Sequence, residues 1–583
     1  MIAKNALTEA SRLLLATLAD AGVEDVVVSP GSRSTPLVVA AVREPRLRCH
    51  SVIDERSAAF FALGQARVTG RASVLVCTSG TALVHYLPAM VEACLTGVPM
   101  LVLSADRPHE LQSGHAPQTI DQVKVFGEYT RASYDLPAPD GTRSWLLGAR
   151  RLAMQAVMTA HDPRPGPVHL NFRARKPLEP KGPEGTEELA LVAEVDAILA
   201  RPIPVPGRSR RTPNEAAVAR ARQRIRGAER GIIVCGPSLP ARALERDAIF
   251  GLSRATSFPV YTEATSQLRY GELPSGAIRV AHLDLVLRAL SRAELPDLVI
   301  QVGLPPTFEV LPKLETLGVT PSLVVLSEDD FCDPSGLAND VLFGDIGETC
   351  RLLGEGLGEP RPSSFGAIDA QVSRVMRSEV EREPFAEGAA VRVLVESMGA
   401  NDTLVVGNSL AVRALDTYTD VGGPALRVVS QRGASGIDGN VALAAGVSKS
   451  LGGRTTLLCG DVTLLHDVGT FVQARSLVAD LRIVLLNNGG GRIFEQLPIV
   501  GVKGLERDVL DLTLTPHSTD FSGVAASAGA RHVRVTSRDA LRDALSAPPS
   551  GLELVEVVLE PSGAIAQSRR LWQAIDAAKL TPG

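Results

Sequence analysis

The chain has 583 residues, of which 45% are apolar and 21% charged, and its formal net charge is -5. This length predicts several domains with large cores. The weakly acidic balance gives no reason to expect a nucleic-acid partner. No apolar run approaches the ~18 residues that cross a bilayer, so no membrane span is expected.

The chain begins with MIAKNALTEASRLLLATLADAG, whose amphipathic period and acidic residues predict a first helix and not a signal peptide. The seven cysteines form no C-x-x-C pair, and Cys77, Cys235 and Cys459 lie inside apolar runs. Reduced core thiols are typical of a cytoplasmic enzyme, which is the expected location. The ten histidines show no metal-binding spacing such as H-E-x-x-H.

Short β-rich runs alternate with helical stretches along three segments. Expected strands of the first are DVVVSP, CHSVIDE, ASVLVCTS, PMLVLSAD and PVHLNF. The second offers GIIVCG, FPVYTE, DLVIQVG and SLVVLSE, and the third TLVVGNS, LRVVSQRG, TTLLCGD, RIVLLNN and LELVEVVLE. This alternation indicates an α/β protein with three doubly wound parallel-sheet domains.

Stretches rich in proline, glycine and charge separate the segments. KPLEPKGPEGTEE and ARPIPVPGRSRRTPNE predict a linker, and GEGLGEPRPSSFGA ends the second segment. The predicted domains are therefore 1–180, 215–366 and 367–583, with a linker at 181–214. The basic run SRRTPNEAAVARARQRIRGAER is interpreted as a solvated helix face that opens the central domain, in preference to a nucleic-acid site.

Two strand ends in the third segment carry small oxygen-bearing side chains. Asp461 follows TTLLCG, and Asn487 and Asn488 follow RIVLL. One helix's worth of sequence separates them, which is the spacing of a crossover between neighbouring parallel strands. Such oxygens, with the carbonyls of a glycine-rich turn, suit a hard divalent cation that holds a diphosphate. Two ordinary loops would explain either piece alone, but a distant acidic residue, Glu55 in VIDERSAAFFALGQAR, favours the metal site.

Hydrogen-bond donors and guanidinium groups follow other strands. An arginine fork suits a carboxylate, and ligands bind at the carboxyl ends of parallel strands. A capped strand-turn-helix or a surface arginine would explain each loop singly, but several arginines facing one cleft are unfavourable without anions. The substrates are therefore predicted to carry two or more carboxylates. The side chains in question are Ser32, Arg33, Arg107, Gln118, Ser409, Arg413 and Arg432.

The pairing of Asp461 with Asn488 resembles the signature of thiamine-diphosphate-dependent enzymes. In that signature Gly-Asp-Gly is followed, further along the chain, by Asn-Asn. Here Val462 replaces the third glycine. Glu55 matches the family's N-terminal glutamate, which touches the cofactor's aminopyrimidine. The resemblance covers essentially the whole chain. It implies pyrimidine-binding, central and diphosphate-binding domains of the decarboxylase type, with thiamine diphosphate and Mg²⁺ (Mn²⁺ as a substitute) as cofactors.

Six stretches resemble more narrowly the branch of this family that acts in menaquinone biosynthesis. They are SPGSRSTPL, DERSAAFFALG, SADRPHEL, GNSLAVR, RGASGIDG and the pair GDVTLLHD…NNGGGRIFEQLP. That branch tolerates an apolar residue at the position of Val462. The resemblance implies decarboxylation of 2-oxoglutarate and addition of the four-carbon product to isochorismate. It also implies a homodimer or homotetramer whose chains share active sites.

The resemblance assigns roles residue by residue. Glu55 is the catalytic residue at the pyrimidine ring, and Asp461, Asn488 and the carbonyl of Gly490 are the metal ligands. The seven donor and guanidinium side chains named above orient the substrates. No central-domain residue is included, because QVGLPPTFEVLPKL has no basic residue before Lys313. The remaining predicted cofactor contacts are Gly436, Ile437, Val462, Thr463, Arg492 and Ile493.

Three alternatives follow from the same residues. Another thiamine-diphosphate 2-oxoacid decarboxylase, or an acetohydroxyacid synthase-like carboligase, would share the cofactor site, but arginine-rich loops argue against small monocarboxylate substrates. A catalytically silent subunit of the same fold is disfavoured because Glu55 and the Asp461–Asn488 pair are both present. A nucleotide-binding protein is disfavoured because SPGSRS and NNGGGR match neither G-x-G-x-x-G nor G-x-x-x-x-G-K-[ST].

Overall fold

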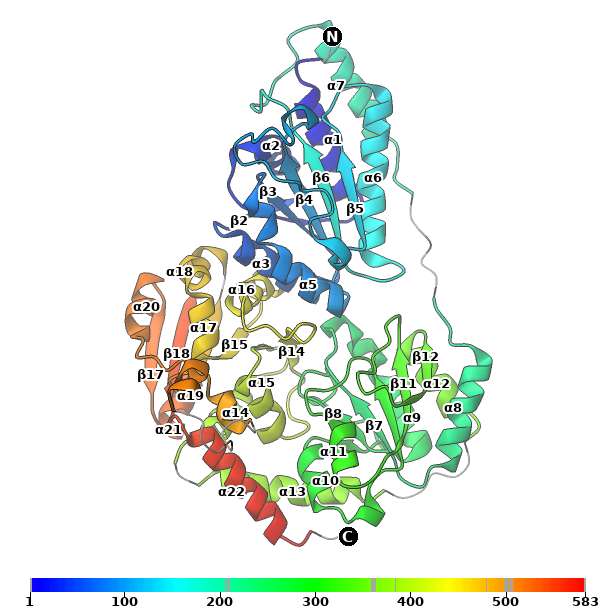
Figure 1. Ribbon diagram of the computed structural model, residues 1–583, viewed down its shortest axis with the longest axis vertical. Helices are drawn as coiled ribbons and strands as arrows, with labels where there is room; N and C mark the ends of the chain where they lie inside the picture. Colours follow the sequence, from blue (N-terminus) through cyan, green and yellow to red (C-terminus); the bar gives the residue numbers. More distant parts are fainter. Residues whose placement is uncertain are drawn as a thin grey trace. The chain divides into compact units, whose positions relative to one another are not determined.

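Each of the three β-rich segments forms a six-stranded parallel sheet in the computed structural model, and helices connect most of the successive strands (Figure 1). The structure describes residues 3–204, 207, 210–357, 363–382, 384–478, 480–497, 502 and 507–580. Parts of the two predicted interdomain breaks, residues 205–206, 208–209 and 358–362, lie outside the described residues.

The first sheet consists of β1 (Asp25–Val28), β2 (Arg48–Ser51), β3 (Ser73–Cys77), β4 (Met100–Asp106), β5 (Ala132–Leu136) and β6 (Pro167–Arg173). Its strand order is β2-β1-β3-β4-β6-β5. The sequence predicts every strand but β5, which lies at the sheet edge. The half-buried, polar sequence ASYDL lacks the apolar run of a central strand.

The second sheet consists of β7 (Gly231–Cys235), β8 (Val260–Thr262), β9 (Arg279–Val280), β10 (Leu298–Val302), β11 (Ser322–Ser327) and β12 (Ala338–Phe343). The third consists of β13 (Thr403–Val406), β14 (Arg427–Ser430), β15 (Thr455–Gly460), β16 (Leu481–Asn487), β17 (Arg531–Val535) and β18 (Leu552–Val558). Their orders are β12-β11-β10-β7-β8-β9 and β14-β13-β15-β16-β18-β17. The third sheet therefore repeats the topology of the first, whereas the second has a different one. The predicted α/β fold with three parallel sheets is confirmed.

The helices are α1 (Ala6–Asp20), α2 (Thr35–Arg43), α3 (Glu55–Thr69), α4 (Thr81–Val84), α5 (Leu87–Thr96), α6 (Arg143–His161), α7 (Thr186–Leu199), α8 (Glu215–Gly227), α9 (Arg246–Thr256), α10 (Leu283–Ala289), α11 (Val310–Thr316), α12 (Ile346–Gly354), α13 (Phe365–Val380), α14 (Glu387–Glu396), α15 (Leu410–Tyr418), α16 (Asn440–Leu451), α17 (Asp461–His466), α18 (Val468–Leu477), α19 (Arg507–Leu514), α20 (Phe521–Ser527), α21 (Arg538–Leu545) and α22 (Gly563–Ala577). None of the helices in the part of the chain that the structure describes is long and apolar enough to span a membrane.

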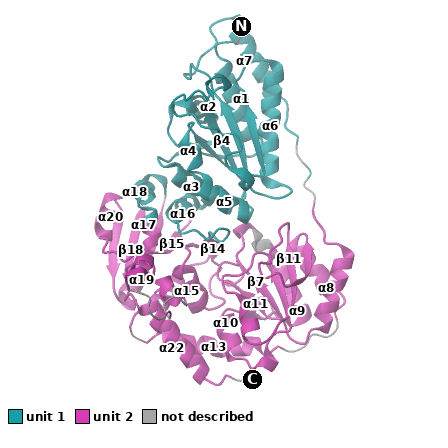
Figure 2. Ribbon diagram, in the orientation of Figure 1, with its two compact units in different colours: residues 1–209, 431–452, 466–479 teal, residues 210–430, 453–465, 480–583 magenta. Residues whose placement is uncertain are grey.

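The chain divides into two compact units (Figure 2). Unit 1 comprises residues 1–209, 431–452 and 466–479, and unit 2 comprises residues 210–430, 453–465 and 480–583. Within unit 2 the second and third sheets share one apolar core, which includes Ile232 and Val234 of β7 with Leu404 and Val406 of β13. The three-domain division drawn from the sequence remains a prediction.

The segment predicted as a linker contains α7. Its apolar residues Leu191, Val195 and Ile198 pack with Leu13 of α1 and Leu146 of α6. The sequence did not predict this helix, because the stretches on either side of it are rich in proline and glycine. The basic run beyond it forms α8, which buries an apolar stripe; two of its four arginines are exposed, and the other two are half-buried and form ion pairs.

Helix α3 packs closely against α16 within unit 1. The two helices cross at glycines: a Cβ on Gly64 would lie 2.2 Å from the Leu443 carbonyl oxygen, and one on Gly446 would lie 2.0 Å from that of Phe61. Only glycine permits this backbone approach. The contact fixes α3, which begins at Glu55, against the helix that follows the RGASGIDG loop.

Candidate active site

Asp461 is the first residue of α17 and directly follows β15. Its side chain is buried. Oδ2 accepts hydrogen bonds from the backbone N–H groups of Gly489 at 2.8 Å and Gly490 at 3.0 Å, while Oδ1 accepts one from Val462 at 2.7 Å. Because β15 and β16 are adjacent parallel strands, this carboxylate reaches the turn after β16. The two strand ends predicted to be neighbours are therefore joined.

The turn after β16 needs glycine. Gly490 has φ +138°, and a Cβ there would lie 2.5 Å from the Leu514 carbonyl oxygen. Beside it, the buried Asn488 donates from Nδ2 to Oε1 of Glu387 at 3.1 Å. Arg492 braces the same turn by donating from Nε to the Asn488 carbonyl oxygen at 3.2 Å. The turn is thus held on several sides.

These groups fit a hard divalent cation. A carboxylate, an amide and a backbone carbonyl offer oxygen ligands within one turn, which is the donor type that Mg²⁺ prefers. Throughout the described ranges no group of three or more His, Cys, Asp or Glu has a metal-binding arrangement. Any metal here would therefore depend on amide and carbonyl oxygens as well as Asp461. Val462 and the buried Thr463 follow Asp461 in α17, and Ile493 lies in the 3₁₀ turn Arg492–Gln496.

Arg33 and Arg107 come together at the end of the first sheet. Ser32 and Arg33 form a 3₁₀ turn after β1, and Arg107 follows β4. Burial lowers the pKa of Arg33, and the charge of Arg107 lowers it further. Arg107 donates to Oγ of Ser79 and, at 2.8 Å, to the carbonyl oxygen of Gln118. Gln118 has φ +60°, which for a residue other than glycine marks local strain of the kind found at functional sites. Two adjacent guanidinium groups favour binding of an anion.

Glu55 begins α3, where Asp54 caps the helix by accepting a hydrogen bond from the Ser57 N–H at 2.8 Å. Glu55 itself is half-buried. Burial raises the pKa of the Cys77 thiol, at the end of β3, to about 12, and the charge of Glu55 adds to that increase. The carboxylate therefore lies near the end of the first sheet, as the sequence predicts.

The loop with Arg432 lies in unit 1 and is held by a buried carboxylate. Glu92 of α5 accepts hydrogen bonds from the backbone N–H groups of Gly433 at 3.0 Å and Ala434 at 2.7 Å. The same carboxylate forms a buried ion pair with Arg67 at 3.0 Å. This pair fixes the backbone that presents Arg432.

The end of this loop, directly after Gly436 and Ile437, is held by the side chain of Asp467. The Asp467 carboxylate accepts hydrogen bonds from the N–H groups of Gly439 and Val441, both at 2.8 Å. Burial raises the pKa of Asp467 to about 6, although both hydrogen bonds act to lower it. Asp467 therefore ties the start of α16 to the start of α18.

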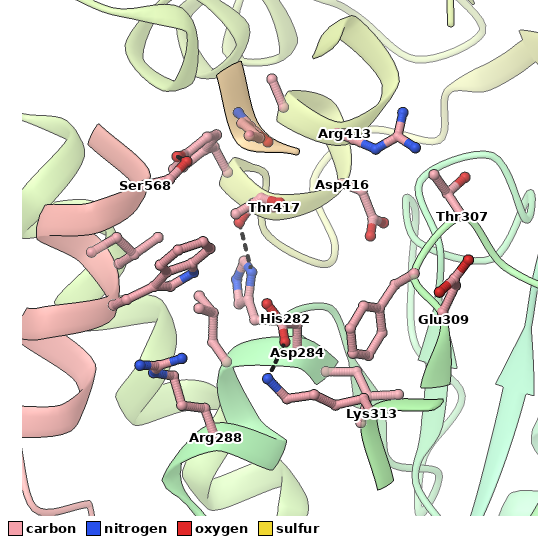
Figure 3. A pocket seen from close by; sticks show the side chains of 18 of the residues that line it. His282, Asp284, Arg288, Thr307, Glu309, Lys313, Arg413, Asp416, Thr417 and Ser568 are labelled. Atoms are coloured by element: carbon pink, nitrogen blue, oxygen red, sulfur yellow. Dashed lines mark hydrogen bonds and ion pairs between the residues drawn. The ribbon is translucent and has the colours of Figure 1, made fainter. Parts of the chain in front are cut away.

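Arg413 lies in a pocket of about 600 Å³ in unit 2 (Figure 3). It donates to the carbonyl oxygen of Ser409, which has φ +68° at the start of α15. Thr307 and Glu309, from the loop after β10, line the pocket together with Lys313. A predicted substrate arginine thus shares a pocket with the central-domain loop from which no site residue was predicted.

The second sheet also anchors the end of α15. The fully buried Arg269 binds Asp416 at 2.6 Å, and the Tyr261 hydroxyl donates to the same carboxylate at 2.6 Å. Glu263 accepts a hydrogen bond from the Thr307 N–H at 2.7 Å and so fixes the pocket loop. The central segment therefore positions the helix that carries Arg413. This is the contribution that it makes to the pocket, since its loop has no basic residue before Lys313.

The predicted site residues fall into two groups. Unit 1 contains Ser32, Arg33, Glu55, Arg107, Gln118, Arg432, Gly436 and Ile437. Unit 2 contains Ser409, Arg413, Asp461, Val462, Thr463, Asn488, Gly490, Arg492 and Ile493. The structure brings neighbours together within each unit, and the union of both groups in one site remains a prediction.

Five buried charged residues that hold these loops were not predicted from the sequence. They are Glu92, Glu263, Glu387, Arg269 and Asp467. Glu92 interrupts the apolar helical run PAMVEACL, and Glu387 directly precedes the run GAAVRVLV. A buried charge in or beside such a run is a signal because it needs a buried partner. Asp467 stands inside the motif GDVTLLHD, where Asp461 drew attention first.

Comparison with known proteins identifies both cofactor-binding segments. Residues 8–125 match the family described as thiamine pyrophosphate enzyme, N-terminal TPP binding domain, and residues 416–553 match its C-terminal TPP binding domain. The crystal structure of benzoylformate decarboxylase from Polynucleobacter necessarius is similar, with a TM-score of 0.70 over 95% of this chain and 98% of that one. At 16% identity this likeness supports the fold alone.

Curated relatives match nearly the full chain. The 2-succinyl-5-enolpyruvyl-6-hydroxy-3-cyclohexene-1-carboxylate synthase of Sorangium cellulosum (strain So ce56) is 41% identical, covering 97% of this chain and 95% of that protein. The enzymes of the same name from Myxococcus xanthus (strain DK1622) and Oceanobacillus iheyensis are 38% and 35% identical, covering 98% and 97% of both chains. The chain therefore belongs to the 2-succinyl-5-enolpyruvyl-6-hydroxy-3-cyclohexene-1-carboxylate synthase family of thiamine pyrophosphate enzymes.

Proposed function

We propose that the chain decarboxylates 2-oxoglutarate and joins the four-carbon product to isochorismate. The product is 2-succinyl-5-enolpyruvyl-6-hydroxy-3-cyclohexene-1-carboxylate, an intermediate of menaquinone biosynthesis, and CO₂ is released. The proposal rests on one observation. The Asp461 carboxylate accepts hydrogen bonds from the backbone N–H groups of Gly489 and Gly490, and Asn488 belongs to the same turn. This arrangement supports a metal–diphosphate site in a family that uses thiamine diphosphate.

In this proposal Asp461, Asn488 and the Gly490 carbonyl hold Mg²⁺, for which Mn²⁺ can substitute. Asp461 is the one charged ligand in the proposed set, so cofactor affinity depends on it most strongly. The remaining contacts to the cofactor come from Gly436, Ile437, Val462, Thr463, Arg492 and Ile493.

Thiamine diphosphate, when bound, supplies a nucleophilic carbon and an electron sink for both decarboxylation and carbon–carbon bond formation. The proposed role of Glu55 is to hold a proton at the pyrimidine ring nitrogen, so that the cofactor's amino group can act as a base. Positioned acid–base groups of this kind contribute ~10²–10⁴-fold to turnover.

The arginines orient the carboxylates of both substrates. Arg33 and Arg107 form a positive pair whose charges disfavour each other without an anion. Arg413 and Arg432, together with Ser32, Gln118 and Ser409, complete the proposed substrate contacts. A guanidinium fork accommodates two carboxylate oxygens at once, which favours dicarboxylate substrates over pyruvate-like ones.

The direct test is to incubate the purified chain with 2-oxoglutarate, isochorismate, Mg²⁺ and thiamine diphosphate, and to measure the product mass. The proposal expects the mass of the six-membered-ring adduct, with release of one CO₂. Release of CO₂ from 2-oxoglutarate without an isochorismate adduct would indicate a simple decarboxylase. Turnover of pyruvate alone would indicate the acetohydroxyacid synthase-like alternative.

We also propose a homodimer or homotetramer in the cytoplasm. Glu55 and Asp461 lie in different compact units yet must act on one cofactor. In similar enzymes the pyrimidine-binding domain of one chain faces the diphosphate-binding domain of another. Analytical ultracentrifugation tests the assembly, and a monomer with full activity would contradict it.

A further inference from the structure

Two adjacent asparagines lie at the end of β16, Asn487 as its last residue and Asn488 directly after it, and a different glutamate holds each of them. Asn487 donates from Nδ2 to Oε1 of Glu556 on β18 at 2.7 Å. Asn488 donates from Nδ2 to Oε1 of Glu387, the first residue of α14, at 3.1 Å. Both glutamates are buried, with 5% and 1% of their surfaces exposed. The chain thus makes the same bond twice, but only Asn488 is a proposed metal ligand.

An amide side chain has two ends, and only its oxygen can bind a cation. Rotation by half a turn exchanges that oxygen for an NH₂ group of nearly the same size. An ionised carboxylate accepts hydrogen bonds and cannot donate them. In the structure the end of the Asn488 amide that faces Glu387 is Nδ2, so Oδ1 points the other way.

We propose that Glu387 is a positioning residue that fixes the orientation of Asn488 and thereby keeps its Oδ1 available to the metal. This inference rests on the metal site of the proposed function. Glu387 does not itself contact the metal in this scheme; it acts through Asn488, as outer partners of metal ligands commonly do.

The other oxygen of Glu387 supports a role beyond stability. Oε2 is buried and has no hydrogen-bond partner among the residues that the structure describes. An unpaired buried carboxylate oxygen is unfavourable for folding, and an apolar side chain would avoid this penalty. The hydrogen bond that Oε1 accepts from Asn488 therefore explains why a glutamate stands at the start of α14.

The first test is Glu387→Met, which keeps side-chain length and removes the acceptor. Free Mn²⁺ is measured by electron paramagnetic resonance during titration with saturating thiamine diphosphate present. The dissociation constant for Mn²⁺ should rise by ~10–100-fold. Glu556→Met is the matched control, because it breaks the neighbouring Asn487 bond and should leave Mn²⁺ affinity near native. If Glu387→Met lowers only the melting temperature of the cofactor-free protein and leaves Mn²⁺ affinity native, the role is structural and the proposal is wrong.

Adding a charge at Asn488 and removing the charge of Glu387 gives a second test, which stays informative if Glu387→Met folds poorly. Asn488→Asp places a carboxylate opposite Glu387, so both groups lose their hydrogen bond and repel each other. Adding Glu387→Gln restores a donor between them. Glu387→Gln should therefore tighten Mn²⁺ binding about tenfold in the Asn488→Asp background and weaken it in the native chain, where an amide can accept or donate and no longer fixes which end of Asn488 faces the metal. An equal effect in both backgrounds would overturn the proposal.

Asp461→Ala in the same titration separates this inference from the proposed function. If Asp461→Ala binds Mn²⁺ like the native chain, the metal site itself is misplaced, and both proposals fail. If Asp461→Ala abolishes binding while Glu387→Met binds with native affinity, the metal site stands, and only the role of Glu387 is refuted.

Discussion

The first and third sheets share one strand order but carry different chemistry at their strand ends. After the first strand of each sheet come Arg33 and Ser409, and after the second come Glu55 and the loop of Arg432. After the third strand come Ser79 and Asp461, and after the fourth Arg107 and Asn488. The first sheet thus carries Arg33, Arg107 and the proposed catalytic residue Glu55, whereas the third carries the proposed metal ligands together with Arg432.

The comparison separates what topology decides from what residue type decides. The shared order brings equivalent loops to the same places in both sheets, and the side chains there then determine whether an anion or a cation can bind. The second sheet has a different order, and its charged residues Arg269 and Glu263 hold neighbouring backbone and the Asp416 carboxylate. Changes at the strand ends of the first sheet should therefore affect chemistry and substrates, whereas changes at Asp461 and Asn488 of the third should affect cofactor retention.

The largest effect is expected at the third sheet. Asp461→Ala removes the one charged ligand of the proposed metal site, so the melting shift produced by Mg²⁺ with thiamine diphosphate should disappear, and activity with it. In the native chain, ligands at a hundred times their dissociation constant stabilise the fold by about 2.7 kcal/mol. Differential scanning calorimetry with and without both ligands measures this, and the cofactor-free protein serves as the reference. An unchanged shift would place the diphosphate elsewhere.

Glu55→Gln should distinguish the role of the first sheet from that of the third most clearly. It preserves side-chain shape but removes the acidic group, so turnover should fall by ~10²–10⁴-fold. The melting shift with Mg²⁺ and thiamine diphosphate should persist, because the third sheet is unchanged. Near-native turnover in this variant would end the assignment of Glu55.

Substrate arginines should give smaller losses. Arg107→Ala removes the proposed bond to a substrate carboxylate, and such a bond contributes roughly 1.5–3 kcal/mol, so kcat/KM for one substrate should fall by ~10–100-fold. Arg107→Lys should recover only part of this, since a point charge cannot bind both oxygens. Arg33, Arg413 and Arg432 are tested in the same way. Native kcat/KM for both substrates in all four alanine variants would contradict the anionic-substrate interpretation.

The smallest effect on activity is expected from the titration of Asp467, which acts on stability. Burial raises its folded pKa to about 6, above the ordinary value of 3.8. The folded state therefore holds its proton longer than the unfolded state, and the free energy of unfolding should fall as pH rises from about 4 to about 6. Asp467→Asn removes this titration and should flatten that part of the curve in urea unfolding measured across pH. A variant that keeps the native slope would assign the pH dependence to another group.

The sequence predicted the parts of the fold that carry strong local patterns. Apolar runs marked the central strands, whereas edge strands such as β5 (Ala132–Leu136) and β17 (Arg531–Val535) are half exposed and polar, so their pattern is weak. Helix α7 was missed because flanking prolines and glycines dominated the composition. The joining of Asp461 to the turn after β16 followed from the crossover spacing and was correctly anticipated.

The residues that hold the candidate site were harder to predict. Glu92, Asp467 and Glu387 each bind backbone or amide groups far away in the sequence, and only the tertiary fold pairs them. Motifs predict side chains that face a ligand because those residue types have recognisable chemistry. A buried carboxylate that holds a loop shows only as an interruption in an apolar helix, and its partner is not encoded nearby.

The central claim is that the ends of the first and third sheets serve one cofactor, with each site shared between two chains. The most direct test mixes two inactive variants, Glu55→Gln and Asp461→Ala, under conditions in which labelled chains are verified to exchange. A hybrid dimer with shared sites retains one site with native Glu55 and native Asp461, so activity should return in proportion to the amount of hybrid. If chains exchange and no activity returns, the shared-site account is contradicted.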